Sequence, residues 1–431
     1  MTPPPVTLQS PLALPLNEVP SYMERLWDGE DVSRPEGAST FTLLVWQPAW
    51  LEQELGRTGG LRGPVTGIQR PELIEAARQA IQQLGLHHAT APFDPALVEA
   101  LRREPGALQP DDLRGQLIDG RISELQPRRL ISVNPLLDRT APLESQVAAY
   151  CPMPEAGAVN TACGDVLVLR GGVPVIAAQL QRIDPLVTPG LPCWVWWNSA
   201  PEDSPEVFDR LALPPRRLII DTSLGDARGG LTLLGQRIRS GQTIYDLNWY
   251  RLRSWRESLA MAFDPPSRRS ALEQIERIDI DIQGHQFCQG LLLGAWIAAQ
   301  LGWSLQHSRF DTEGAIHSQF RRPDGATPAM VVSPAPIGMP TPHSGTVVGL
   351  RLLTTAAEGP GLCVILCGEA AGCMRLEGGG ATQRQLVEHV VPVLDGPLNA
   401  EVTRVLSGGH DSTNPLLRMA GCLAAEMLPA S

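Results

Sequence analysis

Three cysteines lie close together in the stretch GLCVILCGEAAGCMRL, at positions Cys363, Cys367 and Cys373. At about 3.3 Å per residue along a strand, Cys363 and Cys367 would share a face but lie about 13 Å apart, too far for a disulfide. Cys367 and Cys373 flank Gly-Glu-Ala-Ala-Gly, a plausible hairpin loop that would bring two strands side by side. Two alternatives stay open for this pair. Spacing alone favours inert buried thiols, and the other alternative is a redox switch whose loop disulfide cellular dithiols can reduce.

Other residue types that carry chemistry show no pattern of a reaction centre. The sequence has no His-x-x-x-His, Cys-x-x-Cys, Gly-x-Ser-x-Gly or Gly-x-Gly-x-x-Gly, so it indicates no zinc site, nucleophile elbow or dinucleotide loop. The glycines at 378–380 could cradle an anion at the start of a helix, but a plain strand-to-helix turn is the favoured interpretation. The acidic row Glu276, Asp279 and Asp281 is interpreted as the solvated face of a strand. We therefore expect no catalytic residue, no metal and no cofactor.

The stretch DLNWYRLRSWRESLA, residues 246–260, predicts an amphipathic helix with an arginine in its apolar stripe. At about 100° per residue, the stripe consists of Trp249, Leu252, Trp255, Leu259 and Phe263. Arg256 projects between the first and last of these residues. A guanidinium in that position needs a partner.

Two interpretations of this helix remain open, and both can hold together. In the first, Arg256 pairs with a carboxylate or with backbone carbonyls between domains, while Trp249 and Trp255 fill the core. In the second, Arg256 joins Arg251 and Arg253 in presenting planar donors to a protein partner, because arginine and tryptophan are enriched at interface hot spots.

Composition excludes several classes of function. The chain has 431 residues and all 35 basic residues are arginine, which excludes chemistry that needs a lysine amine, such as Walker-type phosphate loops and Schiff bases. A net charge of −11 argues against nucleic acid as a partner. The longest apolar run, residues 290–303, is too short to span a membrane, and the N-terminus does not resemble a secretory signal. The expected location is the cytoplasm, where thiols are mostly reduced.

The order of apolar segments predicts an α/β domain followed by an α+β domain. Residues 1–37 form an N-terminal arm that either docks elsewhere or frays. In 38–270, short apolar strands alternate with helices, which indicates a mainly parallel sheet with flanking helices and a helical insertion near 86–126. In 271–431, consecutive strands joined by Gly- and Pro-bearing turns indicate a mostly antiparallel sheet. Helices are expected from Thr382 and from Ser412.

One motif resembles a known family. DLNWYRLRSWRE, at 246–257, strongly resembles the Asp-Leu-x-Trp-x-Arg-Leu-x-x-Trp-Arg signature of the glucose-6-phosphate dehydrogenase assembly protein family, OpcA. LPCWVWW at 191–197 and RRLIIDTS at 216–223 support the resemblance, and FTLLVW at 41–46 and AAYCP at 148–152 are weaker matches. Together they cover most of the chain from about residue 38.

The resemblance implies a non-catalytic protein that binds glucose-6-phosphate dehydrogenase and promotes its assembly or activity at the entry of the oxidative pentose phosphate pathway. The length, the arm and the Cys367/Cys373 pair look most like the cyanobacterial branch, where the resemblance implies redox control and thioredoxin as a further partner. It makes Trp249, Arg251, Arg253, Trp255 and Arg256 the signature residues, whether their role is structural or partner-binding. The alternative is an enzyme that binds a sugar phosphate or nucleotide at the edge of the parallel sheet.

Overall fold

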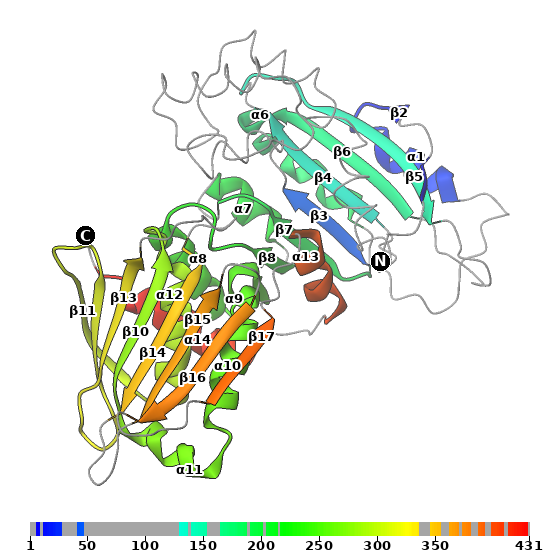
Figure 1. Cartoon of the computed structure of the whole chain (residues 1–431). Coiled ribbons are helices and arrows are strands. Elements are labelled where there is room, and N and C mark those ends of the chain that lie inside the picture. The colour runs from blue at the N-terminus through cyan, green and yellow to red at the C-terminus, as the bar shows by residue number, and fades with distance from the viewer. Residues whose placement is uncertain are drawn as a thin grey trace, which may run out of the picture. The chain divides into compact units, whose positions relative to one another are not determined.

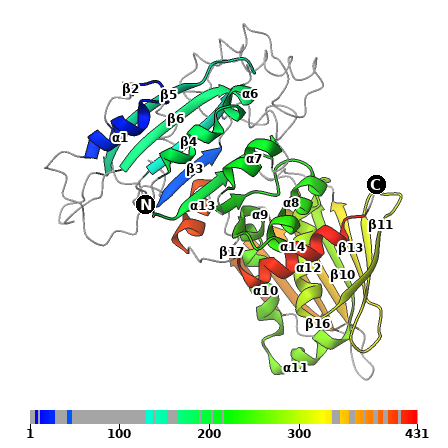
Figure 2. The same cartoon turned by 180° about the vertical axis from the view of Figure 1, so that it is seen from behind.

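The computed structural model describes residues 6–8, 12–27, 41–46, 129–136, 139–152, 164–187, 190–200, 204–213, 216–335, 345–354, 362–369, 373–380, 387–392, 398–408 and 413–429. The chain divides into two compact units. Unit 1 consists of residues 1–220 and 397–411, and unit 2 of residues 221–396 and 412–431. The ribbon is shown from two sides in Figures 1 and 2.

The centre of unit 1 is a parallel sheet. Its strands are β3 (Thr42–Trp46), β4 (Arg129–Leu136), β6 (Gly164–Gly172), β7 (Cys193–Trp197) and β8 (Arg217–Ile220), in the spatial order β6-β4-β3-β7-β8. Numbered along the chain, this is the order 3-2-1-4-5 of doubly wound sheets. The strands are almost continuously apolar and buried, as expected for parallel strands covered on both faces.

The N-terminal arm docks onto the edge of this sheet. Strand β5 (Glu144–Pro152) runs antiparallel to β6, and β1 (Val6–Leu8) and β2 (Leu12–Ala13) pair with β5 in turn. Helix α1 (Val19–Trp27) buries Val19 and Met23. The arm therefore obtains its core from the sheet, because a segment this short cannot form one alone.

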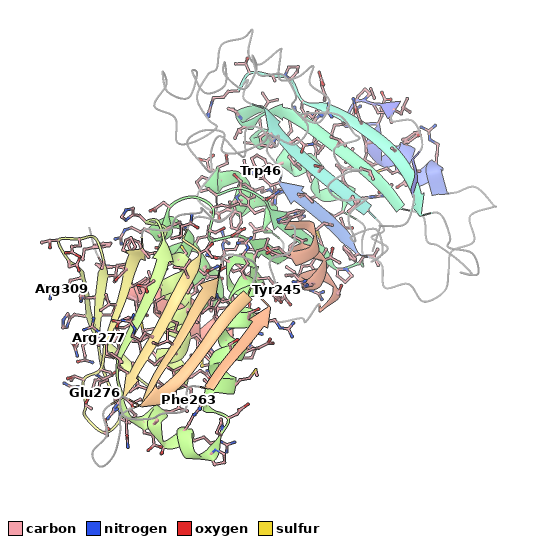
Figure 3. All side chains as sticks on the ribbon, viewed as in Figure 1. Trp46, Tyr245, Phe263, Glu276, Arg277 and Arg309 are labelled. Carbon is pink, nitrogen blue, oxygen red and sulfur yellow. The ribbon has the colours of Figure 1, made fainter. Side chains whose placement is uncertain are left out.

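Short helices complete unit 1: α6 (Val173–Ala177), η3 (Leu180–Arg182), η4 (Asp184–Leu186), α7 (Pro205–Leu211) and α13 (Leu398–Ser407). At the carboxyl ends of β3 and β7, the rings of Trp46 and Trp197 stack at 4.7 Å, and Phe208 packs edge-on against Trp197 at 5.0 Å. Trp46 is labelled in Figure 3. The predicted insertion near 86–126 lies outside the described residues.

Unit 2 is built on an eight-stranded mixed sheet. Its strands are β10 (Ile275–Gln283), β11 (Ser304–Phe310), β12 (Ile316–Arg321), β13 (Ala329–Ala335), β14 (Val347–Thr354), β15 (Leu362–Glu369), β16 (Cys373–Gly380) and β17 (Val387–Pro392). The spatial order is β11-β12-β13-β10-β14-β15-β16-β17. The β10–β13 pair is parallel and the other pairs are antiparallel.

The main helices of unit 2 lie on one face of this sheet, as the two views agree (Figures 1 and 2). They are α8 (Ala227–Arg239), α9 (Leu247–Arg251), α10 (Arg253–Phe263), α12 (Cys288–Gln300) and α14 (Pro415–Met427). The short elements β9 (Ile244–Asp246), α11 (Pro266–Arg269) and η5 (Ser270–Gln274) connect them.

Helix α12 lies unusually close to the sheet because of its glycines. A Cβ at Gly290 would lie 2.7 Å from Val332 Cγ1 and 2.8 Å from Ile282 Cγ2, so no side chain fits there without movement. Alternate residues of β10, Ile278, Ile280 and Ile282, are buried. The acidic residues that alternate with them lie on the opposite face.

Several details differ from the expectations drawn from sequence. The segment expected to be helical from Thr382 contains β17 at residues 387–392, because its β-branched valines complete a ladder with β16. The glycines at 378–380 belong to β16 and not to a strand-to-helix turn. The helix expected over 246–263 is interrupted at Leu252. The compact units divide at Ile220 and not near residue 270, since helices α8 to α10 pack within unit 2.

Candidate functional site

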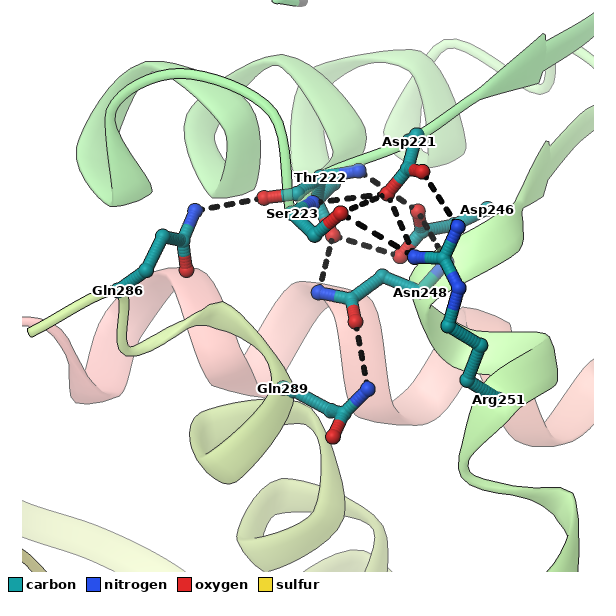
Figure 4. Close-up of polar contacts among 8 residues, drawn as sticks. All are labelled: Asp221, Thr222, Ser223, Asp246, Asn248, Arg251, Gln286 and Gln289. Atoms are coloured by element: carbon teal, nitrogen blue, oxygen red, sulfur yellow. Dashed lines mark hydrogen bonds and ion pairs between the residues drawn. The ribbon is translucent and has the colours of Figure 1, made fainter. Parts of the chain in front are cut away.

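Three chain segments of unit 2 meet in a buried polar network, drawn in Figure 4. The first, Asp221 to Ser223, directly follows β8. The second runs from Asp246, the last residue of β9, to Arg251 at the end of α9. The third is the start of α12, with Gln286 just before it and Gln289 in its first turn. Seven of the eight residues drawn are at most 9% exposed, and the side chain of the eighth, Arg251, is 5% exposed.

An ion pair between Arg251 and Asp221 lies at the centre of this network. Arg251 donates from Nη1 to Asp221 Oδ1 at 3.0 Å and from Nη2 to Oδ2 at 2.6 Å. Ser223 adds bonds to the same carboxylate from its backbone N–H at 3.0 Å and its hydroxyl at 2.5 Å. A two-pronged arginine contact with further donors is the arrangement that offsets the desolvation of a buried charge.

A second carboxylate, Asp246, caps helix α9. Its Oδ1 accepts from the backbone N–H groups of Thr222 at 2.9 Å and Asn248 at 3.2 Å, and its Oδ2 accepts from the Thr222 hydroxyl at 2.8 Å. Burial, assisted by the nearby charge of Asp221, raises the pKa of Asp246 to about 7, although the Thr222 bonds and Arg251 oppose the shift. Asp246 thus ties the turn after β8 to the first turn of α9.

Two glutamines extend the network to α12 and β14. Gln289 donates to Asn248 Oδ1 at 2.8 Å, and its own carbonyl oxygen accepts from the backbone N–H of Val347 at 2.7 Å. Gln286 donates to the backbone oxygen of Thr222 at 2.7 Å and accepts from the backbone N–H of Cys288 at 2.8 Å. The bonds join groups of three chain segments, so the network holds these segments together.

The five signature residues separate into buried and exposed positions. Trp249 and Trp255 are buried, and Arg251 is the inner arginine of the ion pair with Asp221. Arg253 lies at the surface and pairs with Glu257 at 2.7 Å, with side chains 61% and 56% exposed. Of the three arginines, Arg253 is therefore the exposed one.

Arg256 is half-buried and stacks on a tryptophan. Its guanidinium carbon lies 3.6 Å from the centre of the Trp249 ring. Burial lowers the pKa of Arg256 to about 10, and its Nη1 is buried with no hydrogen-bond partner among the described residues. Among the described residues, this cation contacts an indole face, whereas the first of the two sequence interpretations paired it with a carboxylate or backbone carbonyls.

The Cys367/Cys373 pair falls on neighbouring strands, but the cysteine side chains lie outside the described part of the chain. In the β15–β16 hairpin, Cys367 is in register with Arg375, and Cys373 with Glu369. The two cysteines are therefore at diagonal positions, two residues out of direct register. The cysteines whose side chains are described, Cys193, Cys288 and Cys422, are free thiols.

The sequence interpretation missed most of the network. Asp221 lies in the motif RRLIIDTS and Asp246 in the motif DLNWYRLRSWRE, but their spacing in the sequence did not indicate that they lie close together. The available signal was a polar Asp-Thr-Ser directly after a fully apolar strand. Gln286 and Gln289 carried no signal, because isolated glutamines are usually exposed.

No group of three or more His, Cys, Asp or Glu side chains among the described residues could hold a metal ion. No described helix is both long enough and apolar enough to cross a bilayer.

Comparison with known proteins identifies the family. Residues 119–236 match the family model described as glucose-6-phosphate dehydrogenase subunit N-terminal domain, and residues 242–418 match the C-terminal domain of the same description. The OxPP cycle protein OpcA of Synechococcus elongatus is 33% identical over 405 residues, which cover 90% of this chain and 89% of that protein. This chain belongs to the OpcA family. The OpcA protein of Synechocystis is 31% identical over 91% of this chain and 87% of its own length, and that of Nostoc punctiforme is 29% identical over 88% and 85%.

Among solved structures, the similarities are weaker. Levoglucosan dehydrogenase matches with a TM-score of 0.36 and 10% identity, covering 55% of this chain and 76% of its own. The 3-ketoreductase KijD10 from Actinomadura kijaniata matches with a TM-score of 0.37 and 12% identity, covering 60% and 79%. Similarities of this size do not transfer an activity.

Proposed function

We propose that this OpcA-family protein is a non-catalytic assembly factor and allosteric activator of glucose-6-phosphate dehydrogenase, acting in the cytoplasm on the oxidative pentose phosphate pathway. The observation that carries the proposal is the match of both parts of the chain to family models described by that enzyme. The mechanism is linkage: a protein that binds one conformation or oligomer of the enzyme more tightly shifts the population toward it.

Two features of the structure support a role without catalysis. The signature segment contributes Asp246, Asn248 and Arg251 to an internally bonded network, which suits a scaffold. In unit 1, ligands of doubly wound sheets bind where the strand order reverses, which here is between β3 and β7. The stacked side chains of Trp46 and Trp197 occupy the ends of those two strands, and both are at most 1% exposed.

The test is to combine the purified chain with the dehydrogenase from the same organism. We expect co-elution on size exclusion and increased dehydrogenase activity at low glucose 6-phosphate. The matched variant is Arg253→Ala, which removes the exposed arginine of the signature while leaving the buried network intact. If Arg253 contacts the dehydrogenase, this variant should bind it more weakly than the parent protein. Separate elution together with unchanged kinetics of the dehydrogenase would refute the proposal.

We propose redox control through Cys367 and Cys373 as a second layer, with thioredoxin as the reductant. The hairpin register places the two cysteines on adjacent strands but at diagonal positions, so a disulfide between them requires a shift of the hairpin backbone. Activation of the dehydrogenase should then differ between oxidised and reduced protein, and Cys373→Ser should remove the difference. If oxidation leaves activation unchanged in the parent protein, this layer is wrong while the assembly role stands.

One observation favours the alternative of a ligand-binding enzyme, namely the strand order of the parallel sheet, which is common among nucleotide-binding proteins. It predicts that a phosphorylated metabolite or nucleotide raises the melting temperature of the isolated chain. A panel of such ligands with no shift would count against it.

A further inference from the structure

The eight-stranded sheet of unit 2 has one face without helices. Helices α8, α9, α10, α12 and α14 lie on the other face, and no further helix of this unit covers the bare face in the described part of the chain (Figures 1 and 2). This bare face carries charged side chains that are partly open to solvent, together with apolar ones such as Val331. Arg277 of β10 is 55% exposed and Arg351 of β14 is 50% exposed. Arg277 and Arg309 are labelled in Figure 3.

One row of register partners crosses all eight strands. In spatial order from β11 to β17, it reads Arg309, His317, Val331, Asp279, Arg351, Ile365, Glu377 and Glu388. The first and last residues of the row are a cation and an anion, and the second and seventh are a histidine and an anion. The third and sixth are both apolar, and the two central residues are an anion and a cation. The row is therefore complementary to its own reverse.

From this row we infer that the bare face is the interface of a homodimer. The two sheets pack face to face about a twofold axis that runs along the strands between β10 and β14. Such an axis places each residue of the row against the residue at the mirrored position in the second copy. Asp279, which pairs with Arg277 at 2.8 Å and Arg351 at 3.8 Å in its own chain, then also meets Arg351 of the second copy at the centre. At the rim, Arg309 meets Glu388 of the second copy. An isologous interface requires this kind of self-complementarity.

The two neighbouring rows differ in how well they fit the same operation. Asp281 and Gly349 are register partners, and the Asp281 carboxylate lies over Gly349 of its own chain, with Oδ2 2.8 Å from where a Cβ would be. The twofold axis therefore brings the two Asp281 side chains toward each other. Arg277 and Leu353 are also partners, so Arg277 meets a leucine. The Arg277 row brings no like charges together, whereas the two Asp281 carboxylates oppose the arrangement, so the opposite-charge pairs of the long row must outweigh them.

The size of the face is sufficient for a stable dimer. Eight strands about 4.8 Å apart and about seven residues long cover roughly 900 Å². A specific interface typically buries about 800 Å² on each partner. A homodimer through this face is independent of the dehydrogenase and stands or falls separately from the proposed function.

The decisive test uses the two ends of the row. Arg309 on β11 and Glu388 on β17 are about 34 Å apart within one sheet, seven strand spacings, so they cannot compensate for each other within a chain. Arg309→Glu and Glu388→Arg should each raise the dimer dissociation constant about tenfold, which is about 1.4 kcal/mol. An equimolar mixture of the two variants should form heterodimers with near-parental affinity, because each altered residue then meets its opposite charge. Sedimentation velocity of the full-length chain over a concentration series measures all three values.

Controls keep the test decisive. Arg253→Glu makes the same change of charge on the helix side and should leave the dissociation constant unchanged. Circular dichroism and the melting temperature verify folding, and the central swap Asp279→Arg with Arg351→Glu provides a second pair that should preserve the dimer. The inference is overturned if the parent protein stays monomeric at a concentration of about 100 μM, about 100 times a typical micromolar dissociation constant. The inference is also overturned if Arg309→Glu leaves the dissociation constant of the dimer unchanged, or if the mixture of the two variants does not recover the parental affinity.

Discussion

Removal of the buried arginine should expose how much the network contributes to stability. In Arg251→Met the side-chain volume is largely kept, but Asp221 stays buried without its cation. Breaking a buried pair by removing one partner typically costs about 3–5 kcal/mol, because the remaining charge is uncompensated. Here Ser223 still donates two hydrogen bonds to Asp221, at 3.0 and 2.5 Å, so we expect the lower end, about 3 kcal/mol.

The same stretch of chain provides a matched control. Arg253→Met breaks an ion pair with Glu257 at a similar 2.7 Å distance, but in solvent. Exposed pairs contribute about 0.2–1 kcal/mol, so this variant should lose less than about 1 kcal/mol. The comparison isolates burial, since the residue type and the substitution are the same.

Urea unfolding followed by tryptophan fluorescence measures both variants, because Trp249 and Trp255 lie next to the altered arginines in sequence. The double variant Arg251→Met with Asp221→Asn should recover part of the loss, since it removes the uncompensated charge. If Arg251→Met and Arg253→Met unfold at the same urea concentration with equal slopes, the ion pair does not stabilise the fold and our reasoning about the network is wrong.

Three further predictions concern other parts of unit 2. The pKa of Asp246 is raised from 3.8 to about 7, so the folded state binds the proton more tightly than the unfolded state, and this group's contribution to stability should fall as pH rises from about 4 to 7. In a plot of the urea midpoint against pH, Asp246→Asn should flatten the curve over this range, and curves for parent and variant that run parallel would contradict the prediction. Arg256→Met removes a cation–π contact worth about 0.5–2 kcal/mol but also a buried donor without a partner, so the free energy of unfolding in urea should change by less than about 1 kcal/mol. A loss as large as that of Arg251→Met would mean that Arg256 has a stronger partner. Gly290→Ala should lose about 1–3 kcal/mol of stability by overpacking against Val332 and Ile282. Gly235→Ala in α8, where the added Cβ meets the flexible end of Arg239 at 3.3 Å, should be neutral or stabilising in thermal melts. Equal effects of the two variants would show that α12 can move away from the sheet.

The sequence by itself determined much of the architecture. Apolar runs such as LPCWVWW and RLII predicted central parallel strands, because a strand buried on both faces needs no polar alternation. The alternation in IERIDIDI predicted a strand with one buried face, which is observed in β10. The signature motif predicted the family, and the stripe from Trp249 to Phe263 predicted a buried helix face. These are local properties, readable from neighbours in the chain.

Only the tertiary structure decided the segments whose partners are distant. VEHVVP became β17 because β16 supplies a ladder, although a helix was expected in that region. Asp221 and Arg251 are thirty positions apart, and only the packing of α9 beside the turn at Asp221–Ser223 makes them an ion pair. The charge row from Arg309 to Glu388 combines residues from eight strands, so it exists only once the sheet has formed. Patterns fix which face of an element is apolar, but the choice of polar partner depends on three-dimensional contacts that no spacing in the sequence specifies.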